Sequence, residues 1–301
     1  MEKEKKSRRN FIKTSSVIAI ASAVPVYTIA SESENNEYAN KTIPAPLKIG
    51  LMTYNLAKAW SIETIIKNCS ETGFQQAELR TTHAHGVEVS LSKVQREEVK
   101  KRFKDSPLES IALAGAFQYH YNDKNELQRN IEGTKEYLQL AADVGAVGIR
   151  VFPNQLVEGV DPEKTMEQIG KALAEVGKTG YELGVEVRVC VHGNKTSVPA
   201  VIRKIIDYSG SEHVYVNWNC GMEDISEGKG FDDNFNLLKD RIRGVHIHEL
   251  WQAGYPYRRF FEKLTGIGYK GFCNAEIGES PEPVRLMNYY RGLFLAYQNV
   301  I

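Results

Sequence analysis

The sequence predicts a single α/β domain folded as a closed (β/α)₈ barrel, and three observations support this prediction. Eight apolar, β-branched runs recur along residues 47–301, stretches with helical periodicity separate them, and the eight units occupy about 255 residues. Strands that alternate with helices indicate a parallel sheet with right-handed crossovers. An open, doubly wound sheet is the runner-up, but no GxGxxG follows the first run.

The predicted strands follow one another at regular intervals. They begin near residues 47 (LKIGLMTY), 76 (QAELR), 110 (SIALAGAF), 147 (VGIRVF), 185 (VEVRVCV), 214 (VYVNW), 244 (GVHIHEL) and 272 (FCNAEI). Helical patterns fill the intervals, for example SIETIIKNCSETG, LSKVQREEVKKRFKD, NELQRNIEGTKEYLQLAADVG and PEKTMEQIGKALAEVGKTGYELG. Gly73, Gly145 and Gly184 each stand shortly before a strand, where glycine commonly ends a helix.

The fifth run, VEVRVCVH at 185–192, shows which face of a strand points into the barrel. Its valines alternate with Glu186, Arg188, Cys190 and His192, and in an antiparallel sheet such polar groups would face water. In a barrel, the valines pack on helices and the polar set points inward. Glu186 and Arg188 are then expected to compensate each other, because burying unpaired charges is costly. Cys190 and His192 lie at the mouth, where barrel active sites are built.

The same alternation predicts a converging polar set at the carboxyl ends of the other strands. It turns inward Arg150, His246, His248, Asn274 and Glu276, and also Asn217 and Asn219 if Trp218 packs outward. Six of the seven histidines stand at or just beyond a strand end: 83, 85, 120, 192, 246 and 248. Each one alone is more often a structural residue than a ligand. Together with a carboxylate, they favour metal binding or proton transfer.

The first residues resemble a twin-arginine export signal. Ser7-Arg8-Arg9-Asn10-Phe11-Ile12-Lys13 matches S-R-R-x-F-[LI]-K, and an apolar run at 17–24 follows that is too short for a stable membrane span. The resemblance implies export to the periplasm; the alternative is a basic tail on an amphipathic helix. Cleavage is predicted after Ala30 or after Ala23.

The predicted organisation is a signal segment at 1–30, a polar linker at 31–46 and the barrel at 47–301. Lys+Arg and Asp+Glu both number 38, so the formal net charge is zero and no basic stripe suggests a nucleic-acid partner. The four cysteines (69, 190, 220 and 273) show no CxxC spacing, which argues against a disulfide scaffold or a zinc knuckle. The sequence indicates no oligomeric state.

Residues 47–300 resemble the xylose isomerase-like barrel superfamily, the sugar phosphate isomerase/epimerase group. The order and spacing of LKIGLMTYNL, GFQQAEL, VGAVGIRVFP, LGVEVRVCVHG, VYVNWNCG, GVHIHEL and NAEIG carry this resemblance. It implies an enzyme acting on a small sugar. Its epimerase branch holds a divalent metal with Glu, Asp, His and Glu on strands five to eight, and the two glutamates move the substrate proton.

Within that pattern, His246 and Glu276 match the last two ligands, whereas Cys190 and Asn219 stand in place of two carboxylates. The resemblance therefore implies a metal site that departs from the family pattern. Cys190, His246 and Glu276, alone or together with His192, form a softer set that Zn²⁺ could accept, or Mn²⁺ more weakly. The alternative is that the metal is lost. Cys190 could equally be a small hydrophobic residue at a strand end.

The predicted catalytic residues are Glu276, His246 and His192, with Glu276 or a histidine removing a proton next to a carbonyl group. The predicted substrate-binding residues are Arg150, His248, Glu78, His120 and Trp251. For Glu78 the alternative is a salt bridge with Arg80 or a lysine. Trp251, Tyr255 and Tyr257 could stack on a sugar or simply pack on the rim.

Three function classes follow from these residues. The first is an exported sugar isomerase, epimerase or lyase on keto-sugars, the second a sugar-binding barrel with a degenerate site, and the third a nuclease of the endonuclease IV type. The nuclease is the weakest, since it needs more metal ligands and a basic surface.

Overall fold

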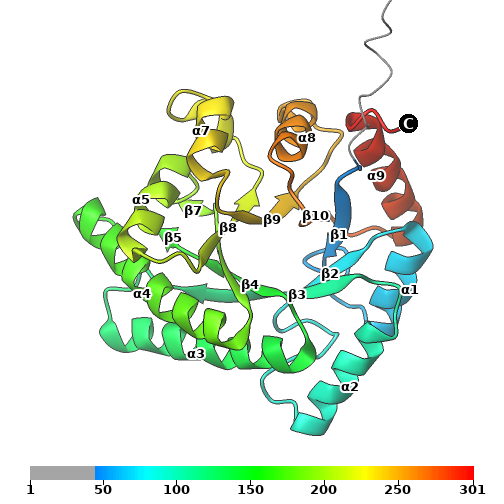
Figure 1. Cartoon of the computed structure of the whole chain (residues 1–301), viewed down its shortest axis with the longest axis horizontal. Helices are drawn as coiled ribbons and strands as arrows, with labels where there is room; N and C mark the ends of the chain where they lie inside the picture. The colour runs from blue at the N-terminus through cyan, green and yellow to red at the C-terminus, as the bar shows by residue number, and fades with distance from the viewer. Residues whose placement is uncertain (1–44) are drawn as a thin grey trace, which may run out of the picture. The chain divides into compact units, whose positions relative to one another are not determined.

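The computed structural model describes residues 45–301, in which eight parallel strands close into a barrel (Figure 1). The strands are β1 (Lys48–Met52), β2 (Gln76–Arg80), β3 (Ser110–Gln118), β4 (Gly148–Phe152), β6 (Glu186–Cys190), β8 (Val214–Asn219), β9 (Ile242–Ile247) and β10 (Phe272–Ala275). Around the barrel they follow the order β1, β10, β9, β8, β6, β4, β3, β2. This confirms the closed barrel and excludes the open sheet.

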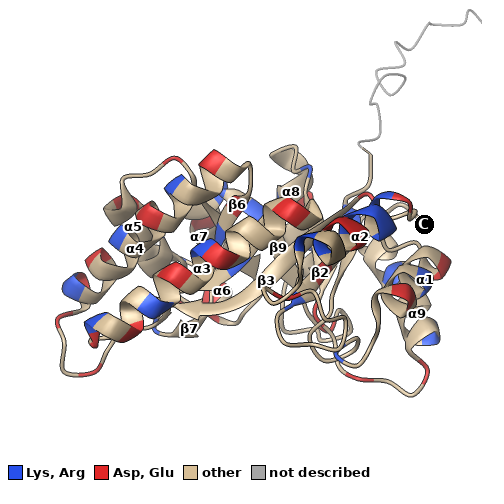
Figure 2. Ribbon diagram, turned by 90° about the horizontal axis from the view of Figure 1, so that it is seen from below, with Lys and Arg blue, Asp and Glu red and all other residues tan. Residues whose placement is uncertain are grey.

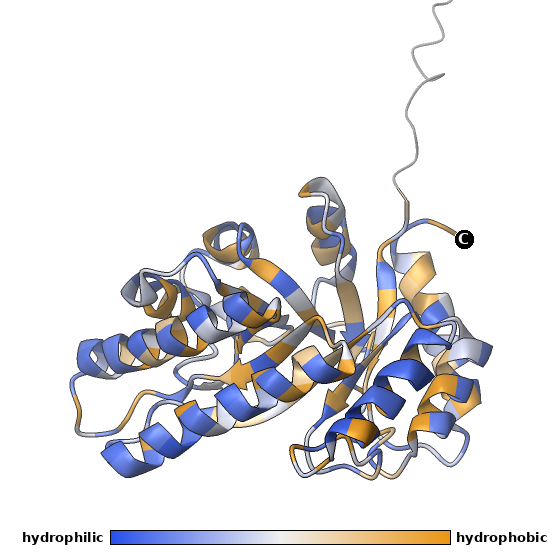
Figure 3. Ribbon diagram, turned by 60° about the horizontal axis from the view of Figure 1, so that its bottom comes forward, coloured by the Kyte–Doolittle hydropathy of each residue, from blue (hydrophilic) through white to orange (hydrophobic). Residues whose placement is uncertain are grey.

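The helices lie outside the strands, and Figure 3 shows hydrophilic residues along the long helices and hydrophobic ones on the strands. They are α1 (Ile62–Thr72), α2 (Lys93–Lys104), α3 (Lys124–Val144), α4 (Pro162–Leu183), α5 (Pro199–Ser209), α6 (Glu223–Ser226), α7 (Phe231–Leu238), α8 (Tyr257–Gly266) and α9 (Pro283–Tyr297). Gly73, Gly145 and Gly184 end α1, α3 and α4 in the left-handed conformation, as predicted.

The inward and outward faces of β6 are those that the alternation predicts. Val187 and Val189 are fully buried in the hydrophobic core between barrel and helices. On the inner face, Arg188 donates from Nε to Glu186 Oε2 at 2.9 Å, so the two charges compensate each other. On β8, Trp218 packs outward against Phe235 with ring centroids 5.7 Å apart, which turns the asparagines beside it inward.

A small second sheet that the sequence did not predict joins the loops after β4 and β6. Its strands are β5 (Asn154–Gln155) and β7 (Gly193–Asn194), paired in parallel. Gly193 has φ +104°, and a Cβ there would lie 1.7 Å from the Asn154 carbonyl oxygen. Only glycine allows this approach. The pairing therefore fixes the chain directly after His192 at the rim of the barrel.

The predicted signal at 1–30 and nearly all of the linker at 31–46 lie outside the described residues. Among residues 45–301, no helix has both the length and the apolar character needed to cross a bilayer. Figure 2 shows acidic and basic residues interspersed on the outer helices. The described surface thus presents charges of both signs on the same helices.

Candidate functional site

A cavity of about 300 Å³ opens at the carboxyl ends of the strands. Its lining comes from β2, β4, β6, β8 and β9 and from the residues that follow β1, β6, β9 and β10: Tyr54, Arg80, Arg150, Phe152, Cys190, His192, Asn219, His246, His248 and Glu276. This is the end of the barrel where active sites of this fold lie. The cavity therefore brings together most of the residues that the sequence predicts for the site.

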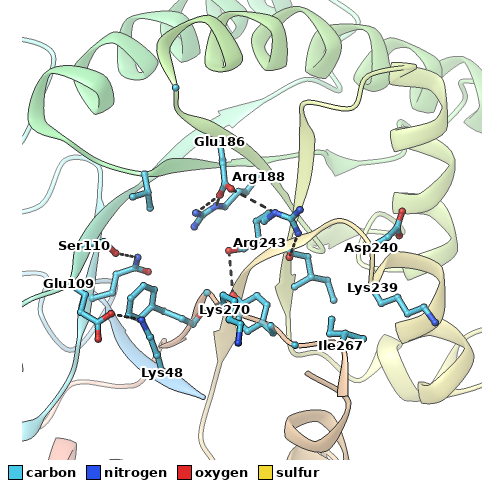
Figure 4. A pocket seen from close by; sticks show the side chains of 18 residues that line it. Lys48, Glu109, Ser110, Glu186, Arg188, Lys239, Asp240, Arg243, Ile267 and Lys270 are labelled. Atoms are coloured by element: carbon cyan, nitrogen blue, oxygen red, sulfur yellow. Dashed lines mark hydrogen bonds and ion pairs between the residues drawn. The ribbon is translucent and has the colours of Figure 1, made fainter. Parts of the chain in front are cut away.

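A larger cavity, of about 1020 Å³, lies at the opposite, amino-terminal end of the strands. Figure 4 shows that several of its charged side chains turn toward one another: Arg188 and Arg243 approach Glu186, and Lys48 approaches Glu109. These five side chains are paired within the protein, and no described histidine, the side chain best suited to move a proton at neutral pH, lines this cavity. The smaller cavity is the better candidate site despite its size.

The central feature of the smaller cavity is an imidazole held between two carboxylates. His246 Nε2 lies 3.0 Å from Glu78 Oε2, and His246 Nδ1 lies 3.2 Å from Glu276 Oε2. His246 is 1% exposed and Glu78 is 2% exposed, whereas the Glu276 side chain is 18% exposed and lines the cavity. Glu276 is thus the one carboxylate of this triad that a ligand can reach.

The interactions among His246, Glu78 and Glu276 determine the protonation state of all three side chains. Burial lowers the pKa of His246, but Glu78 and Glu276 outweigh burial and raise it to about 9. Burial raises the pKa of Glu276, but its hydrogen bond to His246 and the cationic groups nearby lower it to about 2. The pKa of Glu78 is lowered by the same imidazole against the effect of burial. At neutral pH the triad is therefore an imidazolium between two carboxylates.

Glu78 is held in place beside His246 by an asparagine for which a glycine on β1 makes room. Asn274 on β10 donates from Nδ2 to Glu78 Oε2 at 2.6 Å and holds that carboxylate in place. A Cβ on Gly50 would lie 1.9 Å from the Asn274 side-chain oxygen. The missing side chain on β1 lets groups from β2 and β10 meet inside the barrel. Glu78 forms this contact rather than a salt bridge with Arg80.

Two arginines line the same cavity. Arg150 is 4% exposed, donates from Nη1 to the Gly115 carbonyl oxygen at 3.0 Å, and lies with its guanidinium 4.0 Å from the centre of the Phe152 ring. Arg80 donates to the carbonyl and the hydroxyl of Thr81. Their remaining donors supply positive charge to the cavity.

The other histidines at the mouth differ from His246. His248 Nε2 lies 3.1 Å from Asn219 Oδ1, and burial lowers the pKa of His248, which keeps its ring neutral at pH 7. His192 packs on Phe152 with ring centroids 4.8 Å apart and is exposed at the rim. His192 and His248 can therefore contact a substrate as neutral rings.

The donor groups at the predicted metal positions do not fit a divalent metal. Both nitrogens of His246 are already engaged by carboxylates. Burial raises the pKa of the Cys190 thiol to about 12, so forming the thiolate that binds a metal is costly at this position. Asn219 supplies a neutral amide. Within residues 45–301, no group of three potential ligand side chains is gathered in a way that could hold an ion.

Some predicted site residues lie outside the cavity lining. His120 packs beside Tyr121, and Trp251 is 70% exposed and donates to Glu249. Tyr255 and Tyr257 pack against each other on the rim, which favours the structural alternative for both. Three residues that line the cavity were not predicted: Tyr54, Arg80 and Phe152. Arg80 and Phe152 could have been predicted from the alternation of side chains, because Arg80 lies two residues after Glu78 on β2 and Phe152 lies two residues after Arg150 on β4.

A buried carboxyl group lies just beyond β8 and outside the cavity. Asp224 Oδ2 accepts from the Tyr255 hydroxyl at 2.7 Å and from the Gly221 amide at 3.1 Å, while its Oδ1 has no partner. Burial raises the pKa of Asp224 from 3.8 to about 7. Because the folded pKa exceeds the unfolded one, its contribution to stability is complete below pH 3.8 and is lost as the pH rises toward 7.

Asp224→Asn is therefore expected to remove part of the pH dependence of stability. Between pH 4 and 7 the wild-type free energy of unfolding should decline relative to the variant, by up to about 1.4 kcal/mol per pH unit. Urea unfolding at several pH values measures this difference. Parallel pH profiles for the two proteins would contradict the assignment.

The comparisons with known proteins agree with the barrel fold. The family described as "Xylose isomerase-like TIM barrel" matches residues 66–289. Among solved structures, an L-ribulose 3-epimerase has a TM-score of 0.70 at 19% identity over 84% of this chain and 96% of its own. A 3-keto-D-glucoside 4-epimerase from E. coli has a TM-score of 0.67 at 17% identity over 85% and 100%.

A probable 3-DHS dehydratase from Bacillus anthracis also matches, with a TM-score of 0.61 at 16% identity over 84% of this chain and 98% of its own. No curated protein matches the chain in sequence. At these identities the likeness to solved structures shows the fold.

Proposed function

The chain belongs to the xylose isomerase-like TIM barrel family, and from this premise we propose that it is a sugar isomerase or epimerase that removes a proton next to a carbonyl group. The observation that carries the proposal is the triad in which His246 lies between Glu78 and Glu276. The structural neighbours named as epimerases and as a dehydratase support this class of chemistry. Elimination on a keto-sugar remains within the same class, since it also begins with removal of such a proton.

Glu276 is the base in this mechanism. It is ionised at neutral pH and lines the cavity. When its carboxylate accepts the substrate proton, the imidazolium of His246 keeps its second partner, Glu78, so no charge is left buried without a counter-charge. The pKa of Glu276 must rise toward that of the substrate for efficient transfer, and a bound carbonyl group that excludes water provides such a change.

The developing enolate oxygen needs donors close to Glu276. Arg150 and His248 line the same cavity and can donate to an oxygen there. One base suffices where a neighbouring keto group already acidifies the C–H bond. Keto-sugars are therefore the preferred substrates, and unactivated aldose–ketose pairs rank second.

The proposal uses no metal ion, because the groups at the four family positions do not fit one. Two carboxylates are replaced by a protonated thiol and an amide, and the imidazole is fully engaged.

We expect the purified protein to exchange substrate hydrogen for deuterium in D₂O buffer. L-Ribulose, D-fructose and a 3-keto-D-glucoside, the sugars named for the structural neighbours, form the first panel, followed by mass spectrometry of the recovered sugar. Exchange should persist in EDTA, since no metal step is involved. Binding of a sugar without any exchange would instead identify a sugar-binding barrel, the second function that the replaced carboxylates allow.

Export through the twin-arginine route is part of the proposed function and rests on the Ser7–Lys13 pattern. Changing Arg8 and Arg9 together to Lys is expected to leave the protein in the cytoplasm, as judged by cell fractionation. Changing Lys5 and Lys6 to Arg keeps the arginine pair and serves as the control. Unchanged localisation of the first variant would reject the signal.

A further inference from the structure

We propose that the ligand of this cavity is an acidic sugar, whose carboxylate or phosphate ester binds Arg150 and Arg80. That the ligand is a sugar rests on the proposed function. That it is anionic follows from the two guanidinium groups themselves. Both line the cavity that contains Glu276.

Arg150 is a buried cation with unused donors. It is 4% exposed, its Nε has no hydrogen-bond partner, and among residues 45–301 no carboxylate lies within ion-pair distance of it. The two nearest acids in the network, Glu78 and Glu276, are hydrogen-bonded to His246 instead. A buried guanidinium normally has a carboxylate or phosphate partner. The open position beside it is the cavity.

Arg80 adds a second guanidinium from β2. Thr81 holds it through the backbone carbonyl and the hydroxyl, and no described carboxylate forms an ion pair with it. Glu88, whose charge acts on Arg80, is itself bound by the Tyr137 hydroxyl and the Thr82 amide. Such a held but unpaired guanidinium presents a fork that matches an oxyanion.

The charges of the site sum to an excess of one positive charge before a ligand binds. Two carboxylates face three cations in the set Glu78, Glu276, His246, Arg150 and Arg80. An anionic ligand removes this excess. The amino-terminal cavity differs in pairing rather than in net charge, because Arg188 and Arg243 there each lie within ion-pair distance of a carboxylate, that of Glu186 (Figure 4).

The size of the site sets the size of the ligand. A cavity of about 300 Å³ is at the small end of ligand pockets. It suits a monosaccharide with one acidic group rather than an oligosaccharide or a nucleotide.

Calorimetric titration at constant ionic strength tests the inference with D-glucuronate, D-glucose 6-phosphate and D-glucose. At least one of the two acids is expected to bind about 10- to 100-fold more tightly than glucose, the difference that charge-assisted hydrogen bonds provide. The acid that binds more tightly distinguishes a carboxylate from a phosphate ester. Arg150→Gln is expected to abolish the preference, and Arg80→Gln to reduce it.

Arg243→Gln is the matched control, because it removes a guanidinium from the cavity at the other end of the barrel and should keep the preference. If Arg150→Gln does not fold, Arg80→Gln decides. Three results would each overturn the inference. Neither acid binds more tightly than glucose, or the arginine variant that folds keeps the preference for the acid, or Arg243→Gln loses that preference. Glu276→Gln should keep the preference, so failure of proton abstraction and failure of anion binding are distinguished.

Discussion

Replacing Glu276 with glutamine is expected to lower turnover by about 10²–10⁴-fold while the barrel still folds. The amide cannot accept the substrate proton, and no other carboxylate lines the cavity among the described residues. Glu78 cannot take over, because it is 2% exposed and behind His246. Folding should survive, since His246 keeps its contact with Glu78 and the Glu276 side chain is partly exposed.

The measurement is the rate of deuterium incorporation into the substrate, with circular dichroism to confirm folding. Glu279→Gln is the matched control, as it alters an exposed carboxylate three residues away that pairs with Lys58. Cys190→Ser should change the rate by less than about tenfold, because a protonated, buried thiol takes no part in proton transfer. Deuterium exchange by Glu276→Gln at nearly the wild-type rate would contradict the role of Glu276 as the base.

Replacing Glu78 with alanine is expected to lower the free energy of unfolding by about 3–5 kcal/mol. The change leaves a fully buried imidazole with one carboxylate fewer, deprives the Asn274 amide of an acceptor, and opens a void in the barrel. Urea unfolding at pH 7 measures the loss.

Glu78→Gln separates charge from volume. It keeps the size of the side chain but not the charge, so it should cost less than alanine and lower the pKa of His246 from its raised value. Nuclear magnetic resonance titration of the imidazole would detect that fall. An alanine variant as stable as the wild type, or an unchanged pKa in the glutamine variant, would show that Glu78 does not hold His246.

The alternation of side chains along single strands was predictable because it depends on a period of two and nothing else. It placed Arg188 beside Glu186, turned Trp218 outward, and brought His246, Glu276 and Arg150 to one mouth. The helix ends at Gly73, Gly145 and Gly184 were predictable for a similar reason, since the left-handed conformation is local.

The contacts across the barrel were not predictable in the same way. The pairing of Glu78 with His246 joins β2 and β9, which are not neighbours in the sheet, and Glu78 is held there by Asn274, which occupies the space that Gly50 leaves. The sequence alone does not give that space. The pairing of β5 with β7 involves two residues on each strand, too few for any periodicity.

The closure of the barrel has a consequence for how the chain is made. β1 pairs with β10, so Lys48 meets Phe272, and the contact between Glu78 and His246 spans 168 residues of chain. Long-range pairings of this kind form late, because the entropy of closing so large a loop must be overcome first. A nascent chain on the ribosome therefore has an open edge at β1 until the last strand emerges. Chains stopped before residue 272 would keep that edge exposed, and it could pair with other unfinished chains. They would also lack Glu276 and therefore could not form a complete site.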